Sequence, residues 1–269
     1  MFVTRLLSGI VLMIVAILVL IFGSFWLLAV LGLLSLIGVF ELLRVFQMEK
    51  HPLAVIAYLS TAAYYMMLYF HLGHWVMGHF ALTLVVMLVC YVIQYPKYKI
   101  DKVACCLFSV FYVGYMLSFI YQTRGLHQGH WLVWLIIIGA WGSDTCAYVV
   151  GMLIGKHHFS ELSPKKTMEG CIGGVVGAGI IGFIYSCFFP YHQMFLIPPG
   201  IVFPLVVMVG AVISQFGDLS ASAIKRNYEI KDYGSLIPGH GGVLDRFDSV
   251  IFVAPFVYYL LVLTSYLHI

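Results

Sequence analysis

The chain has 269 residues, of which 62% are apolar and 9% charged, and its formal net charge is +3. Soluble domains carry about 25% charged residues and disordered chains combine low hydrophobicity with high charge, so the composition excludes both classes and predicts an integral membrane protein. No polar stretch is long enough for a separate soluble domain, and we expect one membrane domain over residues 1–269.

Nine apolar stretches are long enough to cross a bilayer, since a transmembrane helix needs about 20 mainly apolar residues. We expect these helices near residues 5–22, 24–43, 53–71, 75–95, 103–121, 131–155, 171–189, 200–224 and 246–267. The break between the first two falls at Gly23 and Ser24. Because the runs are continuous and exceed the roughly 10-residue strands of a membrane barrel, the predicted fold is an all-α polytopic membrane protein.

The basic residues predict the orientation of these helices. Nine spans place 13 of the 14 Lys and Arg residues on the side of the amino terminus and only Arg124 on the other side. Short loops rich in Lys and Arg stay in the cytoplasm. We therefore expect a cytoplasmic amino terminus and an external carboxyl terminus, and the compact length favours a bacterial cytoplasmic (inner) membrane.

Acidic residues inside the spans indicate where chemistry takes place, because ionisable groups in membrane helices are costly and usually functional. Asp144 and Asp218 fall inside spans of the carboxyl-terminal half, whereas the first five spans contain no comparable acid and Glu41 lies near the cytoplasmic boundary. We therefore interpret residues 1–130 as scaffold spans and residues 131–269 as the catalytic spans and cytoplasmic loops.

The eighth span carries a polar stripe at helical spacing, and its members share one face of the helix. They are Ser214, Asp218, Ser222 and Lys225. A polar face on an apolar helix indicates a buried, wet or metal-filled site, and a helix–helix hydrogen bond is the alternative interpretation. At 1.5 Å per residue, Asp218 lies roughly 10 Å below Lys225, at the depth of lipid headgroups.

The densest polar stretch covers residues 225–248. Its glycines, which include Gly241 and Gly242, let backbone N–H groups approach a ligand, and such arrangements bind phosphate oxygens. Asp245 and Asp248 share a face at the start of the last helix, and hard carboxylates suit Mg²⁺ or Mn²⁺. Basic residues beside them are typical of a site that neutralises a metal-bound polyphosphate. A plain solvated loop is the alternative.

The connection between the sixth and seventh spans is the third polar element. Lys165 and Lys166 follow a Ser-Pro turn and precede Thr167, a pattern that favours a phosphate contact over simple anchoring at the membrane surface. Asp144 lies deeper in its span than Asp218, so we expect a kink or a water-filled cleft to bring the two carboxylates together.

No Walker A, GxSxG, HExxH or dinucleotide-binding pattern is present, so covalent nucleophile chemistry is not indicated. The segment from Ser222 to Asp248, with Ser-Ala-Ile-Lys-Arg, Lys-Asp, Pro-Gly-His-Gly-Gly and Asp-Arg-Phe-Asp in this order, resembles the signature of the phosphatidate cytidylyltransferase (CDP-diacylglycerol synthase) family. The Gln215–Asp218 segment, Asp144 and the Ser163–Thr167 segment are also similar to that family.

The resemblance implies that CTP condenses with phosphatidic acid to give CDP-diacylglycerol and pyrophosphate. It implies that Asp218 and Asp245 hold Mg²⁺ or Mn²⁺ on converging helices, with Asp248 and Asp144 in support. The implied catalytic and phosphate contacts are Lys225, His240, Lys165, Lys166, Thr167, Ser222, Arg226, Lys231, Gly241, Gly242 and Arg246. Membrane lipids are further expected partners, nucleic acid is not, and a homodimer is left open.

Two other interpretations are kept as alternatives. A related CTP-dependent lipid kinase, such as a polyprenol kinase, or a nucleotidyltransferase with another lipid acceptor would share the metal and phosphate sites. A cation-coupled transporter would use Asp144 and Asp218 as an ion site. The absence of paired broken helices and the presence of the basic Gly/His loop disfavour the transporter.

Overall fold

The computed structural model of the chain describes residues 2–160, 162–237, 239 and 241–265. The described residues pack into two compact units, one within residues 1–121 and 230–246 and the other within residues 122–229 and 247–269. The last helix, α12 (Leu244–Thr264), contributes its first residues to one unit and the remainder to the other. The prediction of a single membrane domain stays a prediction.

The helices confirm the all-α polytopic membrane fold. Within the described residues, eight helical segments are long and apolar enough to cross a membrane, and they coincide with the second to ninth predicted spans. Helix α1 (Phe2–Phe22) occupies the first, and Gly23 alone separates it from α2 (Ser24–Val45), as expected from the break in the sequence. The positions of the two termini relative to the membrane stay a prediction.

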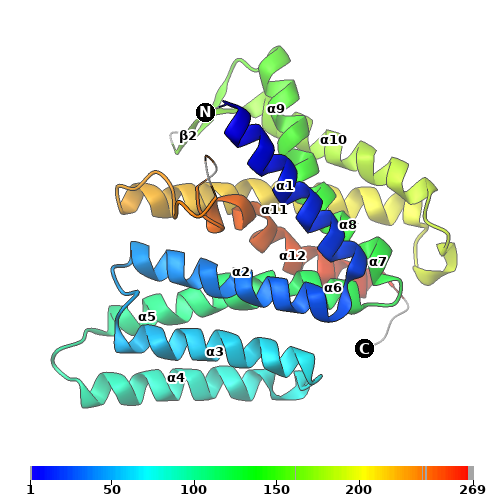
Figure 1. Cartoon of the computed structure of the whole chain (residues 1–269). Helices are drawn as coiled ribbons and strands as arrows, with labels where there is room; N and C mark the ends of the chain where they lie inside the picture. The colour runs from blue at the N-terminus through cyan, green and yellow to red at the C-terminus, as the bar shows by residue number, and fades with distance from the viewer. Residues whose placement is uncertain (1, 161, 238, 240, 266–269) are drawn as a thin grey trace. The chain divides into compact units, whose positions relative to one another are not determined.

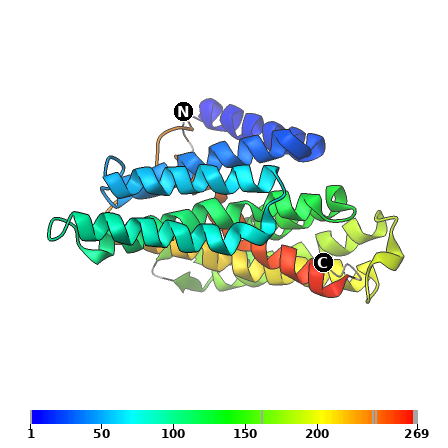
Figure 2. The same cartoon turned by 90° about the horizontal axis from the view of Figure 1, so that it is seen from below.

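In the first unit, helices α2, α3 and α4 run side by side (Figures 1 and 2). Buried hydroxyl groups join these helices: Ser35 Oγ of α2 lies 2.7 Å from Tyr65 OH of α3, and Ser60 Oγ of α3 lies 2.9 Å from Thr83 Oγ1 of α4. The remaining elements of this part are α3 (Pro52–Tyr69), η1 (Gly73–Trp75), α4 (Val76–Ile93), α5 (Ile100–Ser109), the π-helical η2 (Val110–Tyr115) and the start of α6 (Phe119–Gly125). The same unit also contains the segment 230–246, which leads into α12.

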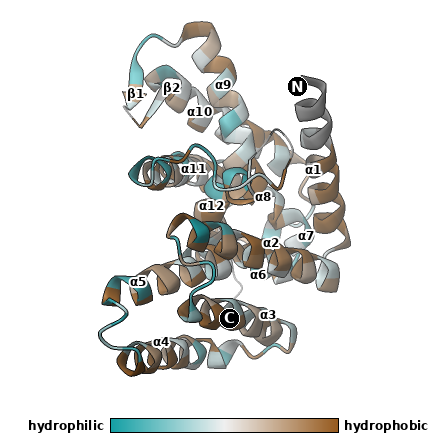
Figure 3. Cartoon of the chain, turned by 60° about the vertical axis from the view of Figure 1, so that its left-hand side comes forward, coloured by the Kyte–Doolittle hydropathy of each residue, from teal (hydrophilic) through white to brown (hydrophobic). Residues whose placement is uncertain are grey.

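In the second unit, α10 (Met168–Cys187) packs against both α9 (Ser143–Ile154) and α11 (Pro199–Asn227). Glycines permit this close approach, because a Cβ atom on Gly173 would lie 2.5 Å from Val150 and one on Gly177 would lie 2.6 Å from Cys146. The other elements before α12 are α7 (Gly129–Leu132), α8 (Trp134–Ile137), the π-helical η3 (Ile138–Gly142), β1 (His158–Ser160), β2 (Ser163–Thr167) and η4 (His192–Met194). The helices are mainly hydrophobic, and hydrophilic residues gather on the strands and on α11 (Figure 3).

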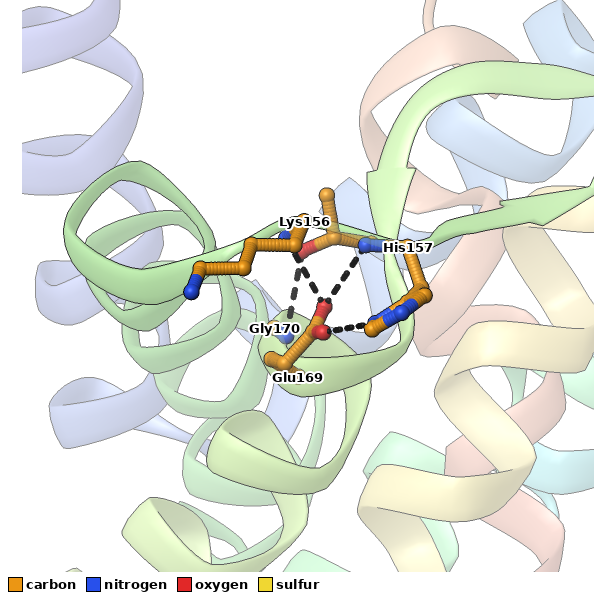
Figure 4. A network of polar contacts seen from close by, with 5 residues as sticks. Lys156, His157, Glu169 and Gly170 are labelled. Atoms are coloured by element: carbon orange, nitrogen blue, oxygen red, sulfur yellow. Dashed lines mark hydrogen bonds and ion pairs between the residues drawn. The ribbon is translucent and has the colours of Figure 1, made fainter.

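A short hairpin connects α9 to α10, where the sequence predicts only a turn. Strands β1 and β2 pair antiparallel, with His158 opposite Thr167 and Ser160 opposite Ser163. The Glu169 carboxylate joins the two ends of this connection: it accepts hydrogen bonds from the backbone N–H groups of Lys156 and His157, and it lies 2.5 Å from His157 Nδ1 (Figure 4). The hairpin therefore begins from a fixed point at the ends of the two helices.

Candidate active site

Three carboxylates from three helices lie together in the second unit, and we name them the acid cluster: Asp144 on α9, Asp218 on α11 and Asp248 on α12. Asp144 lies within electrostatic range of Asp218 and hydrogen bonds with the Ser249 hydroxyl group. Asp248, which is buried, lies within electrostatic range of both other carboxylates and of Lys225. The sequence predicted that Asp144 and Asp218 come together, and the structure places them so.

The helix that carries Asp144 is irregular directly before this residue. The π-helical segment η3 ends at Gly142, and Asp144 stands in the first turn of the α-helix that follows. A π-helical turn adds a residue to the turn and changes the direction of the side chains after it, and such turns are frequent at functional sites. This irregularity occurs where the sequence led us to expect a kink.

Lys166 reaches the acid cluster from β2. Its Nζ atom lies 2.6 Å from Asp218 Oδ2, and both side chains are about three-quarters buried, with exposed fractions of 25% and 29%. Burial alone lowers the pKa of the Lys166 ammonium group, but the neighbouring Asp218 and Asp144 carboxylates outweigh burial and raise that pKa above its usual value. Lys166 is therefore a permanent cation that compensates part of the negative charge of the cluster.

The polar stripe on α11 continues below Asp218. Gln215 donates from Nε2 to the carbonyl oxygen of Cys171 on α10, 2.9 Å away, which fixes the helix pair. The hydroxyl oxygens of Ser214 and Ser143 are buried and have no hydrogen-bond partner within the described residues. Buried polar atoms are nearly always hydrogen bonded, so these two hydroxyl groups, which stand close in sequence to Asp218 and Asp144, are candidates to bind a water molecule or a ligand.

The ligand atoms of the acid cluster are of the type that divalent cations prefer. Three carboxylates supply hard oxygen ligands of the kind that Mg²⁺ and Mn²⁺ prefer, and the two unsatisfied serine hydroxyl groups are additional oxygen donors. In the structure Asp218 pairs with the ammonium group of Lys166, and within the described residues no group of three His, Cys, Asp or Glu side chains is arranged so that it could hold a metal ion. A metal at the acid cluster therefore stays a prediction.

Asp245 lies in the first unit and is held by the backbone. Its Oδ2 atom accepts hydrogen bonds from the N–H groups of Tyr233 and Gly242, at 2.8 and 2.9 Å. Gly241 has a φ of +83°, and a Cβ atom there would lie 2.8 Å from the same oxygen. A glycine is required at this position because only it combines the left-handed backbone with so close a carboxylate. The convergence of Asp245 with Asp218 stays a prediction.

Two residues of α2 contact the segment 230–246, and the sequence assigned neither to the site. The buried Glu41 carboxylate accepts hydrogen bonds from the N–H groups of Val243 and Leu244, at 3.0 and 2.9 Å. Arg44 donates from Nη2 to the carbonyl oxygen of Tyr233, 2.7 Å away. In the sequence, Glu41 and Arg44 stand one turn apart at the end of an apolar helix. This pattern indicates that the helix has a polar partner but does not identify that partner.

The other predicted phosphate contacts lie in several places. The Thr167 hydroxyl oxygen accepts a hydrogen bond from Gly170 N and caps α10. Lys165 lies in β2, but its side chain is outside the described part, as is all of His240. Exposed basic residues and half-buried polar residues complete the set. The exposed ones are Arg226, Lys231 and Arg246, and the half-buried ones are Ser222 and Lys225. Their roles toward phosphate stay predictions.

Apolar spans that carry carboxylates, one of which pairs with a lysine of the connecting strand β2, define an integral membrane protein with a polar site suited to phosphate-transfer chemistry. The family model described as the cytidylyltransferase family matches residues 3–264. The chain therefore belongs to this family of nucleotidyltransferases.

Curated relatives agree with this membership. A phosphatidate cytidylyltransferase of Bacillus subtilis is 36% identical over 190 residues, which cover 69% of this chain and 68% of that protein. Proteins with the same name from Staphylococcus epidermidis and Staphylococcus aureus are 37% and 38% identical over 174 and 173 residues, which cover 64% of each chain. The chain spans about two thirds of the length of the curated relatives it matches.

Proposed function

We propose that the chain is a CTP:phosphatidate cytidylyltransferase, which condenses CTP with phosphatidic acid to CDP-diacylglycerol and pyrophosphate. The observation that carries the proposal is the ion pair of Lys166 with Asp218 inside the acid cluster, in a chain that belongs to the cytidylyltransferase family. The name shared by the relatives from Bacillus and Staphylococcus supports phosphatidic acid as the acceptor.

The reaction needs charge neutralisation more than a protein nucleophile. A phosphate oxygen of phosphatidic acid attacks the α-phosphorus of CTP in line, the bond from that phosphorus to the β-phosphate oxygen breaks, and pyrophosphate leaves. Lys166 is the permanent cation of the site, and we assign it to the phosphate oxygens that gain charge in this step. Asp218 sets the position of Lys166 through their ion pair.

Mg²⁺ or Mn²⁺ is the proposed cofactor, with Asp144, Asp218 and Asp248 as ligands from the acid cluster. A bound divalent cation would supply neutralisation of the phosphate charge. Asp245 stays a predicted ligand, and the two backbone hydrogen bonds to its Oδ2 atom support this assignment because they hold the carboxylate in one orientation.

The proposed location is a bacterial cytoplasmic membrane, with the site on the cytoplasmic side. The relatives are bacterial, and 13 of the 14 basic residues fall on the side predicted to face the cytoplasm. CTP is a cytosolic nucleotide that does not cross a bilayer, so a site on this side has direct access to it.

The position of a phosphorus label tests the reaction type. The purified protein in detergent micelles with phosphatidic acid receives CTP labelled either at the α-phosphorus or at the γ-phosphorus. We expect the α-label in a lipid that carries CMP and the γ-label in pyrophosphate. Transfer of the γ-label to the lipid, with release of CDP, would show a lipid kinase instead.

A further inference from the structure

Glu41 is a fully buried carboxylate at the start of α12, although it belongs to α2. Its exposed fraction is 3%, and each of its two oxygens accepts one backbone hydrogen bond, Oε1 from Val243 and Oε2 from Leu244. The first N–H groups of a helix have no partner within the helix. Glu41 therefore serves as the amino-terminal cap of a helix that begins about 200 residues later in the sequence.

The segment 230–246 is shaped around this carboxylate. A Cβ atom on Gly234 or on Gly242 would collide with the Glu41 carboxylate. The distance from a Cβ atom on Gly242 to Glu41 Oε1 would be only 2.5 Å. Arg44, one turn further along α2, holds the carbonyl oxygen of Tyr233. The backbone N–H group of Tyr233 in turn binds Asp245 Oδ2. A continuous set of hydrogen bonds thus leads from α2 to Asp245.

The contact has a specific physical requirement. Two N–H groups need two acceptors, so an amide side chain, which offers only one acceptor atom, leaves one N–H group unsatisfied in a buried site. The positive end of the helix dipole also favours a negative charge at this point. The carboxylate of Glu41 meets both requirements, whereas an isosteric glutamine meets neither in full.

We propose that Glu41 is a positioning residue for the reaction: it fixes the start of α12 and the glycine-rich segment 230–246, and through them the orientation of Asp245. Because Glu41 is only 3% exposed, we assign it no contact with a substrate, and Arg44 assists it through Tyr233. This inference rests on the proposed function, because the segment is ordered for chemistry that the nucleotidyl transfer requires.

Two readouts test the proposal with Glu41→Gln, Glu41→Asp and a matched control. Ser35→Ala removes a buried hydrogen bond from the same helix, that of Ser35 with Tyr65, at a point away from the segment 230–246. The first readout is kcat and KM for CTP with phosphatidic acid. The second is hydrogen exchange of the amides of Val243 and Leu244 in the full-length protein, which needs neither substrate nor metal.

We expect Glu41→Gln to lower kcat at least about tenfold with a smaller effect on KM, and to accelerate exchange at Val243 and Leu244 about tenfold or more. Glu41→Asp, which keeps the charge, restores part of both, and it also serves as the test if the glutamine variant does not fold. Ser35→Ala lowers thermal stability but leaves kcat within about twofold, since it loses an ordinary hydrogen bond.

The outcomes separate this proposal from the proposed function. The positioning role alone is overturned if the wild-type protein makes CDP-diacylglycerol and the Glu41→Gln variant has unchanged kcat and unchanged hydrogen exchange. A kcat loss in Ser35→Ala equal to that in Glu41→Gln also overturns it, because the effect is then one of general stability. A wild-type protein without any cytidylyltransferase activity overturns the proposed function and with it this inference.

Discussion

Buried and half-buried carboxylates occur in both units of the molecule, and their partners differ. In the first unit, Glu41 and Asp245 accept hydrogen bonds from backbone N–H groups. In the second unit, Asp218 pairs with the ammonium group of Lys166, and other carboxylates lie beside it. A carboxylate bound to backbone amides orders a chain segment. A carboxylate that is paired with a side-chain ammonium group can exchange this partner for a ligand, because the lysine side chain has rotatable bonds.

This difference separates residues that shape the site from residues that carry its charge. A backbone amide cannot leave its carboxylate without unfolding of the segment, whereas a lysine side chain can move by rotation about its side-chain bonds. We therefore expect substitutions in the second unit to act mainly on turnover. Substitutions in the first unit should act on the order of the segment 230–246 and on turnover together.

Asp218→Asn should have the largest effect. The substitution removes the charge that pairs with Lys166 and a proposed metal ligand, so we expect turnover to fall by about 1,000-fold or more. The measurement is the initial rate of CDP-diacylglycerol formation at saturating CTP and phosphatidic acid. Size-exclusion chromatography in detergent should show a protein of unchanged size, and a rate within tenfold of wild type would contradict the assignment of Asp218.

Lys166→Ala should rank next, with a loss of about 100-fold in turnover, because the site loses its permanent cation while the carboxylates remain. Lys166→Arg, which keeps the charge, should recover much of this loss. Lys97, a lysine outside the site, provides the control, and Lys97→Ala should behave like wild type. Equal rates for Lys166→Ala and Lys97→Ala would show that Lys166 serves only as a membrane-surface anchor.

The raised pKa of Lys166 predicts how this comparison behaves as the pH changes. Because Asp218 and Asp144 raise it above its usual value, the stabilisation from the ion pair is fully present below the ordinary pKa of lysine and is lost only as the pH rises through the raised pKa. From about pH 7 to about pH 9, the ratio of the wild-type and Lys166→Ala rates should therefore stay constant. A ratio that falls over this interval would indicate a neutral amine.

Gly242→Ala should have a moderate effect that involves both turnover and order. Its new Cβ atom would lie 2.5–2.6 Å from atoms of the Glu41 carboxyl group, so the segment must shift. We expect about a tenfold loss of turnover together with faster hydrogen exchange at Val243 and Leu244. Loss of turnover with unchanged exchange would mean that Gly242 acts through a ligand and not through the order of the segment.

Glu169→Gln should have the smallest effect. Glu169 joins Lys156 and His157 at the base of the hairpin (Figure 4), and contacts of this kind at the protein surface contribute little stability. We expect the melting temperature to fall by about 1–3 °C and turnover to stay within about twofold. A loss of turnover comparable to that of Lys166→Ala would show that the hairpin base controls the position of Lys166.

The sequence predicted the spans well because a bilayer imposes one strong requirement, a run of apolar residues of sufficient length. It also predicted that Asp144 and Asp218 come together, because acidic residues inside membrane spans are costly and usually belong to a functional site. The role of Glu41 was not predictable. Its partners, Val243 and Leu244, are apolar residues about 200 positions away that contribute only backbone N–H groups. Every residue except proline has such a group, so the amino-acid sequence does not indicate which ones will bind Glu41.

The hairpin of β1 and β2 shows the same limitation. Five residues, Ser163–Thr167, contain the lysines that the sequence singled out, but their pairing with His158–Ser160 depends on backbone hydrogen bonds and on the fixed point at Glu169. Charge and motif identified Lys166 as a candidate contact. Only the structure shows that Asp218 is the partner of its ammonium group.

Removal and return of the metal tests the central assignment most directly. The purified protein is treated with EDTA, dialysed, and assayed with CTP and phosphatidic acid, while the binding of added Mn²⁺ is followed by electron paramagnetic resonance for the wild type and for Asp218→Asn. We predict loss of activity with EDTA, recovery with Mg²⁺ or Mn²⁺, and Mn²⁺ binding that is at least about tenfold weaker in the variant. Full activity in EDTA, or equal Mn²⁺ binding by both proteins, would contradict the assignment of the acid cluster as the metal and phosphate site.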